Sequence, residues 1–260
     1  MNPTMQLLLN RKSVRAYENK PISEDMKSDI LRAAMRAPTA GNMMLYSIIH
    51  VRDQHTKDTL ARTCDNQPFI SKAPLVLLFL ADYQKWFDYF RFSGAEQLGN
   101  QQSEGMLRPG EADLLLACCD ALIAAQTAVI AAESLGIGSC YIGDIMENYE
   151  VHRDLFQLPK YVFPICLLCF GYATKQQKGR PLTKRFSNEY IVFENKYKLL
   201  GANDFIEMRN QIKDQMRDEI QLDEGSTNIG QTIYLRKFSA DFSKEMRRSV
   251  KVILKRWVEE

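Results

Sequence analysis

Apolar positions along this chain follow two different spacings, and each spacing predicts one type of secondary structure. Helical spacing covers three ranges: residues 23–38, 54–62 and 111–135. Ser23 is a residue type that caps helix N-termini, and Pro38 is expected to end the first of these helices. Strands are predicted over three further ranges, residues 45–51, 74–80 and 162–170, and the continuous apolar run over 74–80 predicts a buried strand.

The helix expected over residues 111–135 is apolar on nearly all sides, which places it at the centre of the fold or in a subunit interface. Asp120, Gln126 and Glu133 interrupt its apolar run, so we interpret it as a core helix and not as a membrane span. Residues 91–111 contain glycine and proline without a regular pattern, and they predict a loop over a site.

The character of the sequence changes after about residue 200. We expect one domain over residues 1–200 and a helical extension over residues 201–260 that packs on the main body or on a partner subunit. A separate interaction module is the alternative interpretation of this extension. A charged amphipathic helix is expected over residues 205–220. Ser243 is expected to cap a last helix, which has four apolar residues on one face: Met246, Val250, Ile253 and Trp257.

Charge and cysteine usage exclude several classes of function. The net charge of +2 is too small to predict nucleic acid or a membrane as a partner, and no signal peptide is visible, so we expect a cytoplasmic protein. The six cysteines and three histidines show no zinc-type spacing, so no metal site is predicted. Cys166 and Cys169 lie in an expected strand whose alternate residues face opposite sides, which predicts buried thiols and not a redox pair.

A glycine-rich segment over residues 136–143 invites comparison with a dinucleotide-binding fingerprint. Its spacing is wrong, and it follows a helix where the fingerprint follows a strand. The chain also contains no P-loop motif and no G-x-S-x-G motif. A Rossmann nucleotide site, a P-loop and a serine hydrolase are therefore not predicted.

Five polar or glycine-bearing segments remain. In chain order they are RKSVR from Arg11, PTAGN from Pro38, NQPF from Asn66, GIGSCYIG from Gly136 and KGR from Lys178. Taken singly, each has an ordinary interpretation as a turn or as a solvated basic patch. As an ordered set they resemble the FMN-dependent nitroreductase family, and the resemblance spans about residues 5–200.

The resemblance implies that the basic segments bind FMN. Arg11, Lys178 and Arg180 are expected to hold the phosphate, with help from Lys12, because charged donors match phosphate oxygens. Arg15 is expected near N1 and O2 of the flavin ring, where a cation stabilises the negative charge that develops on reduction.

The resemblance also implies which residues surround the ring. Ser13 and Gln67 are expected to hydrogen-bond its pyrimidine edge. Tyr141, Ile142 and Gly143 are expected beside the ring, with a backbone N–H of Ile142 or Gly143 aimed at N5. A partner subunit is expected to supply the remaining residues: Pro38, Thr39, Ala40 and Asn42.

The fold and function implied by the family follow. We expect an α+β, nitroreductase-like fold with a central, mainly antiparallel sheet flanked by helices, in an intertwined homodimer. NADH or NADPH is expected to reduce the FMN, which then reduces nitroaromatics, quinones or similar small molecules, and no catalytic side chain is predicted because the cofactor carries the chemistry. The alternatives are dehalogenation, enone or pteridine reduction or flavin destruction on the same scaffold, and a non-enzymatic flavin-binding protein.

Overall fold

The computed structural model describes residues 1–101, 105–215 and 222–259. Its strands are β1 (Tyr46–His50), β2 (Leu75–Asp82), β3 (Gly138–Ile142) and β4 (Val162–Gly171). Its helices are α1 (Pro3–Asn10), α2 (Glu24–Ala34), α3 (Gln54–Thr63), α4 (Phe69–Lys72), α5 (Gln84–Phe92), α6 (Ala95–Gln101), α7 (Glu111–Ser134), α8 (Tyr149–Phe156), α9 (Lys175–Gly179), α10 (Ala202–Gln215), α11 (Ile229–Ile233) and α12 (Asp241–Val258). Short helical turns are η1 (Ala40–Asn42), η2 (Gly143–Met146), η3 (Asn188–Tyr190) and η4 (Tyr234–Phe238).

The strands form one sheet in the order β1-β2-β4-β3, and every neighbouring pair is antiparallel. The two central strands, β2 and β4, are the longest and almost wholly buried. Pro164 lies inside β4 at a register shift opposite Phe79 and Leu80, where its missing N–H disturbs the ladder least. These observations confirm the expected α+β fold with an antiparallel sheet.

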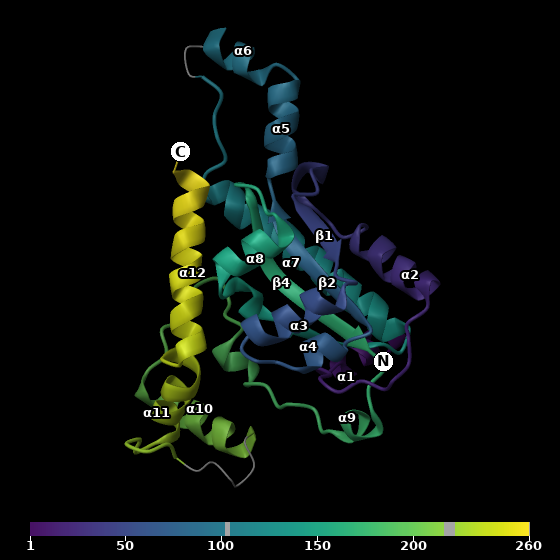
Figure 1. Cartoon of the computed structure of the whole chain (residues 1–260). Helices are drawn as coiled ribbons and strands as arrows, with labels where there is room; N and C mark the ends of the chain where they lie inside the picture. The colour runs from purple at the N-terminus through teal and green to yellow at the C-terminus, as the bar shows by residue number, and fades with distance from the viewer. Residues whose placement is uncertain (102–104, 216–221, 260) are drawn as a thin grey trace. The chain divides into compact units, whose positions relative to one another are not determined.

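Helices cover both faces of this sheet (Figure 1). One face packs against α2 and α7 through a core that includes Phe79, Ala125 and Cys166. The other face packs against α3 and α4 through a core that includes Leu60 and Cys169. Cys166 and Cys169 therefore face opposite sides of β4, as predicted, and all six cysteines are free thiols.

The helix expected over residues 23–38 begins as predicted but ends early. The Ser23 hydroxyl accepts a hydrogen bond from the Met26 N–H at 3.3 Å and caps α2. The helix ends at Ala34 because the residue before Pro38 is kept out of the helical region and the chain turns ahead of it.

The prediction that Ser243 caps the last helix is wrong. Helix α12 begins at Asp241, an acid that interacts favourably with the positive end of the helix dipole. The Ser243 side chain instead donates to the Lys237 carbonyl at 2.5 Å.

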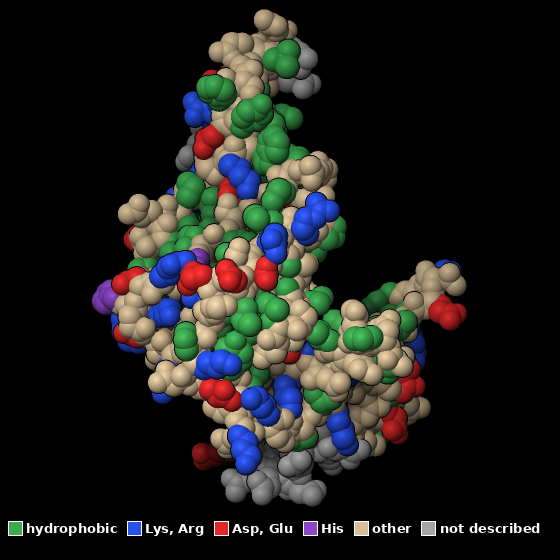
Figure 2. Space-filling model, turned by 90° about the vertical axis from the view of Figure 1, so that its right-hand side faces the viewer, with side chains coloured by type: hydrophobic (Ala, Val, Ile, Leu, Met, Phe, Trp, Pro, Cys, Tyr) green, Lys and Arg blue, Asp and Glu red, His purple; other side chains and the backbone are tan. Residues whose placement is uncertain are grey.

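The loop expected over residues 91–111 is wrong in part. Helix α5 reaches Phe92, and α6 occupies much of the range that lacked an obvious pattern, while residues 102–104 lie outside the described residues. Trp86 anchors α5 by donating from its indole N–H to the Met43 carbonyl at 2.6 Å. Large apolar side chains, including Phe92 and Leu98, are exposed on α5 and α6, which lie at the top of Figure 1 and Figure 2.

Within the part of the chain that the structure describes, α7 is the one helix long and apolar enough to cross a membrane. A row of small residues along it, which includes Ala117, Ala121, Ala124 and Ala128, is fully buried. Because α7 packs against α2 and the sheet, it is a core helix, as expected. Figure 2 shows Lys and Arg interspersed with Asp and Glu over the face that it draws.

The chain divides into two compact units, residues 1–180 with 245–260, and residues 181–244. Most of α12 therefore belongs to the first unit, a division different from the predicted one at residue 200. The reason is the apolar face of α12, since Ile253 and Trp257 are buried in the first unit and the Trp257 ring lies 5.4 Å from that of Tyr161. In the second unit, an ion pair joins Asp223 to Arg236; residues 216–220 of the helix expected there lie outside the described residues.

Candidate functional site

The segment Arg11–Arg15 lies along the edge strand β3. Ser13 forms a parallel bridge with Ser139, and the Val14 N–H donates to the Ser139 carbonyl at 2.9 Å. A Cβ atom at Gly138 would lie 2.5 Å from Val14 Cγ2, so this close approach requires glycine at that position. The contacts fix the basic segment against the outer edge of the sheet.

The second basic segment is tied to the first by Lys12. The Lys12 ammonium donates to the carbonyl oxygens of Lys178 at 2.7 Å and of Arg180 at 2.6 Å. The Lys178 ammonium pairs with Glu18 at 2.9 Å, and Glu18 in turn follows the Arg11–Arg15 segment. The structure therefore brings together the segments that contain Arg11, Lys12, Lys178 and Arg180. Two of the three N–H groups of the Lys12 ammonium donate to backbone carbonyls of the second segment.

The two arginines of the first segment have different neighbours. Burial raises the pKa of Glu133 in the last turn of α7, and the positive charge of Arg11 opposes that rise. Burial also raises the pKa of the Cys140 thiol in β3, and the Arg15 guanidinium lowers it. Arg11 thus lies near the end of α7, and Arg15 lies beside the middle of β3.

Gln67 lies at the far end of β3, next to the residues that follow the strand. Its amide nitrogen donates to the Cys64 carbonyl at 3.1 Å and to the Asp144 carboxylate at 2.7 Å. Asp144 directly follows Tyr141, Ile142 and Gly143, so Gln67 and these three predicted ring contacts share one end of the strand. Ile142 is buried in the core, whereas Gly143 is exposed.

Asp144 and Glu147 form a carboxyl pair behind Gln67. Glu147 is only 4% exposed. Burial, a hydrogen bond to Asp144 and the negative charges of Asp144, Asp65 and Glu245 raise the pKa of Glu147 to about 8. At neutral pH Glu147 therefore keeps its proton. Neither acid was predicted from the sequence, although an acid directly after Gly143 in an apolar segment is a usable signal.

We expect the Glu147→Gln variant to remove one contribution to the pH dependence of stability. The pKa of Glu147 is raised in the folded protein, so between about pH 4.5 and pH 8 the folded protein retains a proton that the unfolded chain has lost. This contribution to stability falls as pH rises through that window and is constant above it. Urea unfolding of both proteins across the window should show the wild type losing stability relative to the variant, whereas a constant difference would contradict the assignment.

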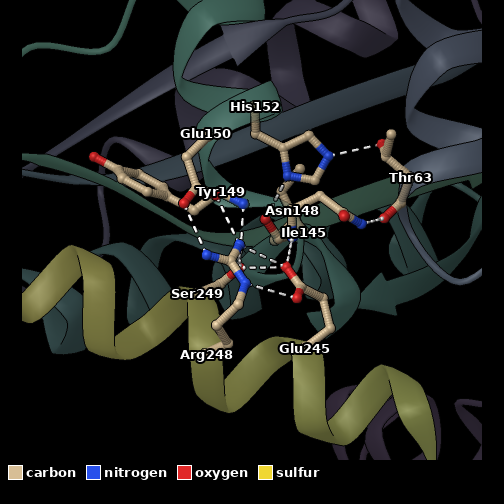
Figure 3. Close-up of polar contacts among 9 residues, drawn as sticks. All are labelled: Thr63, Ile145, Asn148, Tyr149, Glu150, His152, Glu245, Arg248 and Ser249. Atoms are coloured by element: carbon tan, nitrogen blue, oxygen red, sulfur yellow. Dashed lines mark hydrogen bonds and ion pairs between the residues drawn. The ribbon is translucent and has the colours of Figure 1, made fainter.

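A polar network joins α12 to Asn148 and Glu150, which follow Glu147 in the chain (Figure 3). Arg248 donates to both carboxylate oxygens of Glu150, at 2.8 and 2.7 Å, and to Glu245 at 2.8 Å. Glu245 also accepts from the Asn148 N–H at 3.1 Å, and the Arg248 pair lowers the pKa of Glu245 to about 2. Asn148 follows Glu147, so α12 fixes the backbone beside the carboxyl pair.

His152 supports the same segment from the other side. Burial lowers its pKa, so the imidazole is neutral and has a single N–H. Nδ1 lies 2.8 Å from the Ile145 carbonyl, which can only accept, so Nδ1 carries the proton. Nε2 lies 2.7 Å from the Thr63 hydroxyl (Figure 3). These bonds satisfy both ring nitrogens and give His152 a structural role.

The predicted partner-subunit residues lie on a loop held by the buried carboxylate of Asp120. Asp120 accepts from the Thr39 hydroxyl, the Ala40 N–H at 3.0 Å and the Leu45 N–H at 3.1 Å. Pro38 and Asn42 are exposed at the tip of this loop. In the sequence, Asp120 served only to exclude a membrane-spanning helix. A lone acid within an apolar helix also indicates a buried polar partner, and this signal was not used to predict the loop contact.

Within one chain, the structure does not bring this loop to the other predicted residues. The loop precedes β1, and Arg11–Arg15 lies along β3, the opposite edge strand. The two edges are three strands apart, or about 14 Å. The start of β1 lies level with Phe163 of β4, and the start of β3 lies opposite Gly171 of β4. These two positions are separated by about 25 Å along β4, in addition to the distance across the sheet. The loop and the basic segment therefore occupy opposite corners of the sheet.

The residues along β3 fit an elongated anionic ligand such as FMN. One end carries two basic segments joined by Lys12, where Glu18 pairs the charge of Lys178. The other end carries Gln67, whose carbonyl oxygen has no hydrogen-bond donor within the described part of the chain. Between them runs β3, in which Tyr141 is the partly exposed residue. A phosphate fits the cationic end, and a ring with hydrogen-bonding groups fits the amide end.

Comparison with known proteins gives consistent results. A family model described as "Nitroreductase family" matches residues 8–172. An "FMN reductase [NAD(P)H]" from Bacillus subtilis is 32% identical over 181 residues, which are 70% of this chain and 70% of that protein. An "Oxygen-insensitive NADPH nitroreductase" from Salmonella typhimurium is 30% identical over 200 residues, 77% of each chain.

Solved structures show the same fold over nearly the whole chain. A structure from Bacteroides fragilis matches with a TM-score of 0.82 and 27% identity, covering 97% of this chain and 99% of that one. Nitroreductase A from Vibrio parahaemolyticus matches with a TM-score of 0.78 and 23% identity, covering 98% of each chain. The second match is informative about fold alone.

Proposed function

The chain belongs to the nitroreductase family, and on that premise we propose that it is a cytoplasmic, FMN-dependent oxidoreductase that passes hydride from NADH or NADPH to small-molecule acceptors. The observation that carries this proposal is the arrangement along β3, where Lys12 joins two basic segments at one end and Gln67 and Asp144 lie at the other. Residues distant in sequence thereby form one elongated surface with a cationic end.

The cationic end is proposed to bind the phosphate. Arg11 and Arg180 would donate charge-assisted hydrogen bonds to phosphate oxygens, each contributing about 1.5–3 kcal/mol. Lys178 would exchange its pairing with Glu18 for the more highly charged phosphate. The Lys12 contacts with two carbonyls support a positioning role for its side chain, because they tie the Lys178–Arg180 segment to the Arg11–Arg15 segment.

The strand edge and its far end are proposed to hold the ring. When bound, FMN supplies the hydride chemistry, so the protein needs only to bind, orient and polarise. Ser13 and Gln67 would bind the pyrimidine edge, and the exposed Gly143 leaves room for a ring to approach the backbone N–H groups of the segment Tyr141–Gly143. Arg15 would place a positive charge next to the part of the ring where negative charge develops on reduction.

A second copy of the chain is proposed to complete the site. The loop that contains Pro38, Thr39, Ala40 and Asn42 lies at the opposite corner of the sheet from Arg11, so one chain alone cannot bring them together. Helix α7 also leaves four apolar side chains exposed on the face away from its own core: Leu115, Leu116, Leu122 and Ile123. An apolar stripe of this kind is expected to be covered in a homodimer.

The acceptor is proposed to be a nitroaromatic, a quinone or a related small molecule. The test is a purified, FMN-loaded protein assayed with NADH and NADPH against nitroaromatics, quinones and halogenated aromatics. We expect turnover of nitroaromatics or quinones. Exclusive turnover of halogenated aromatics would instead favour a dehalogenase, and no turnover with either nucleotide would favour a different electron donor.

We expect the Arg15→Ala variant to lower the midpoint potential of bound FMN, with a smaller loss of affinity than Arg11→Ala produces. The reason is that loss of a cation beside the ring disfavours the reduced, more negative form. Spectroscopic redox titration against a reference dye measures the potential. Arg52, paired with Glu24 near the other edge of the sheet, offers a control, since Arg52→Ala should leave the potential unchanged.

A further inference from the structure

Gln67 can offer only one of its two amide atoms to a ligand. Its NH₂ group has two hydrogens, and both have partners, namely the Cys64 carbonyl at 3.1 Å and the Asp144 carboxylate at 2.7 Å. Both partners lack a proton to give, so the amide cannot be turned around without losing two hydrogen bonds. The carbonyl oxygen Oε1, which has no donor among the described residues, is the atom left for a ligand.

Asp144 holds this orientation by accepting from the Gln67 amide nitrogen at 2.7 Å. Glu147, 96% buried, keeps the proton of the pair and donates it to Asp144. Asp65 and Glu245 add negative charge around Glu147, which favours its neutral form further. Asp144 is therefore free to accept from Gln67 with its full charge, in the stronger class of hydrogen bond.

We propose that Asp144 and Glu147 are positioning residues that lock the Gln67 amide with its oxygen toward the ligand, so that tight binding requires an N–H donor on the ligand's ring edge. This inference rests on the proposed flavin function and deepens it. On the rim of the oxidised flavin ring, N1, N5, O2 and O4 accept hydrogen bonds and N3–H alone donates. The lock therefore selects the unsubstituted N3–H edge.

The first test uses the wild-type apoprotein and two ligands, FMN and FMN methylated at N3. Binding is measured by fluorescence titration of each ligand. We expect N3-methyl FMN to bind at least tenfold more weakly, because one hydrogen bond is lost and a methyl group is pressed against an unsatisfied oxygen. Equal affinity for the two ligands would overturn the inference while leaving FMN binding, and so the proposed function, intact.

The second test uses Asp144→Asn. An asparagine NH₂ group can donate to Gln67 Oε1, so the Gln67 amide can turn, at the cost of its bond to the Cys64 carbonyl, and present its own NH₂ group instead. We expect FMN to bind about tenfold more weakly and the preference for FMN over N3-methyl FMN to fall to roughly twofold or less. Simple electrostatics predicts the opposite sign, since removing a negative charge near the site should favour an anionic ligand.

Asp65→Asn is the matched control. It removes a negative charge from the same cluster, but Asp65 is exposed, and among the described residues the Gln67 amide nitrogen bonds to Cys64 and Asp144 instead. We expect the affinity for FMN and the ratio between the two ligands to stay at wild-type values. A ratio that stays at the wild-type value in Asp144→Asn, or that falls equally in Asp65→Asn, would overturn the inference. Failure of the wild type to bind either flavin would overturn the proposed function together with it.

Discussion

Replacing Arg11 with alanine is expected to raise the Kd for FMN by roughly 10- to 100-fold, since charge-assisted hydrogen bonds to phosphate are worth about 1.5–3 kcal/mol. Arg11 directly precedes Lys12, whose ammonium contacts the Lys178–Arg180 segment, and we propose that it binds the phosphate from the first basic segment. Isothermal titration of the apoprotein with FMN measures the change.

Comparing riboflavin with FMN separates the loss of a phosphate contact from a general loss of structure in the variant. Riboflavin lacks the phosphate, so its affinity should change little in Arg11→Ala if the contact is the one proposed. Arg11→Lys keeps the charge but loses the bidentate geometry, and it should give an intermediate Kd. An equal loss of affinity for riboflavin and FMN would contradict the assignment, and so would a lowered thermal midpoint that accounts for the whole effect.

Replacing Asp120 with alanine is expected to lower the free energy of unfolding by about 3–5 kcal/mol. The Asp120 carboxylate is 2% exposed and accepts from Thr39, Ala40 and Leu45. Its removal leaves two backbone N–H groups and a hydroxyl without their acceptor inside the core, where each unsatisfied group is costly. Urea unfolding followed by circular dichroism measures the loss.

This variant should also weaken FMN binding, because Asp120 shapes the loop that a second subunit is proposed to contribute. Asp120→Asn keeps an oxygen acceptor and should lose roughly half as much stability. Glu111→Ala, an exposed acid at the start of the same helix, is the matched control and should change stability by less than about 0.5 kcal/mol. A loss below about 1 kcal/mol in Asp120→Ala would show that the loop does not depend on this carboxylate.

The sequence predicted the elements whose apolar pattern was strong. β2 and β4 read as continuous apolar runs, and the Ser23 cap located the start of α2. β3 was not predicted. Glycine and serine have weak strand preference, and the glycine spacing of this segment drew attention to a dinucleotide-binding motif instead of a strand. Its place at the sheet edge depends on pairing with β4, a long-range contact that no local pattern encodes.

The candidate site shows the same division. The ordered segments and their family resemblance named the residues, but not how they hold one another. Lys12 donates to two backbone carbonyls, and Asp144 accepts hydrogen bonds from the Gln67 amide and from neutral Glu147. The Lys12 and Gln67 bonds are tertiary contacts between residues far apart in the chain, so no local pattern predicts them. Asp120 was visible as an interruption of an apolar helix, yet its partners could be identified only from the fold.

The central claim is that this chain binds FMN along β3 and reduces it with a nicotinamide nucleotide. The most direct measurement is an anaerobic titration of the FMN-saturated protein with NADH or NADPH, followed by visible absorption. We predict a yellow complex whose visible absorption falls in proportion to the nucleotide added and returns when a nitroaromatic or a quinone is admitted. A protein that stays colourless after saturation with FMN, or a yellow complex that neither nucleotide bleaches, would contradict the claim.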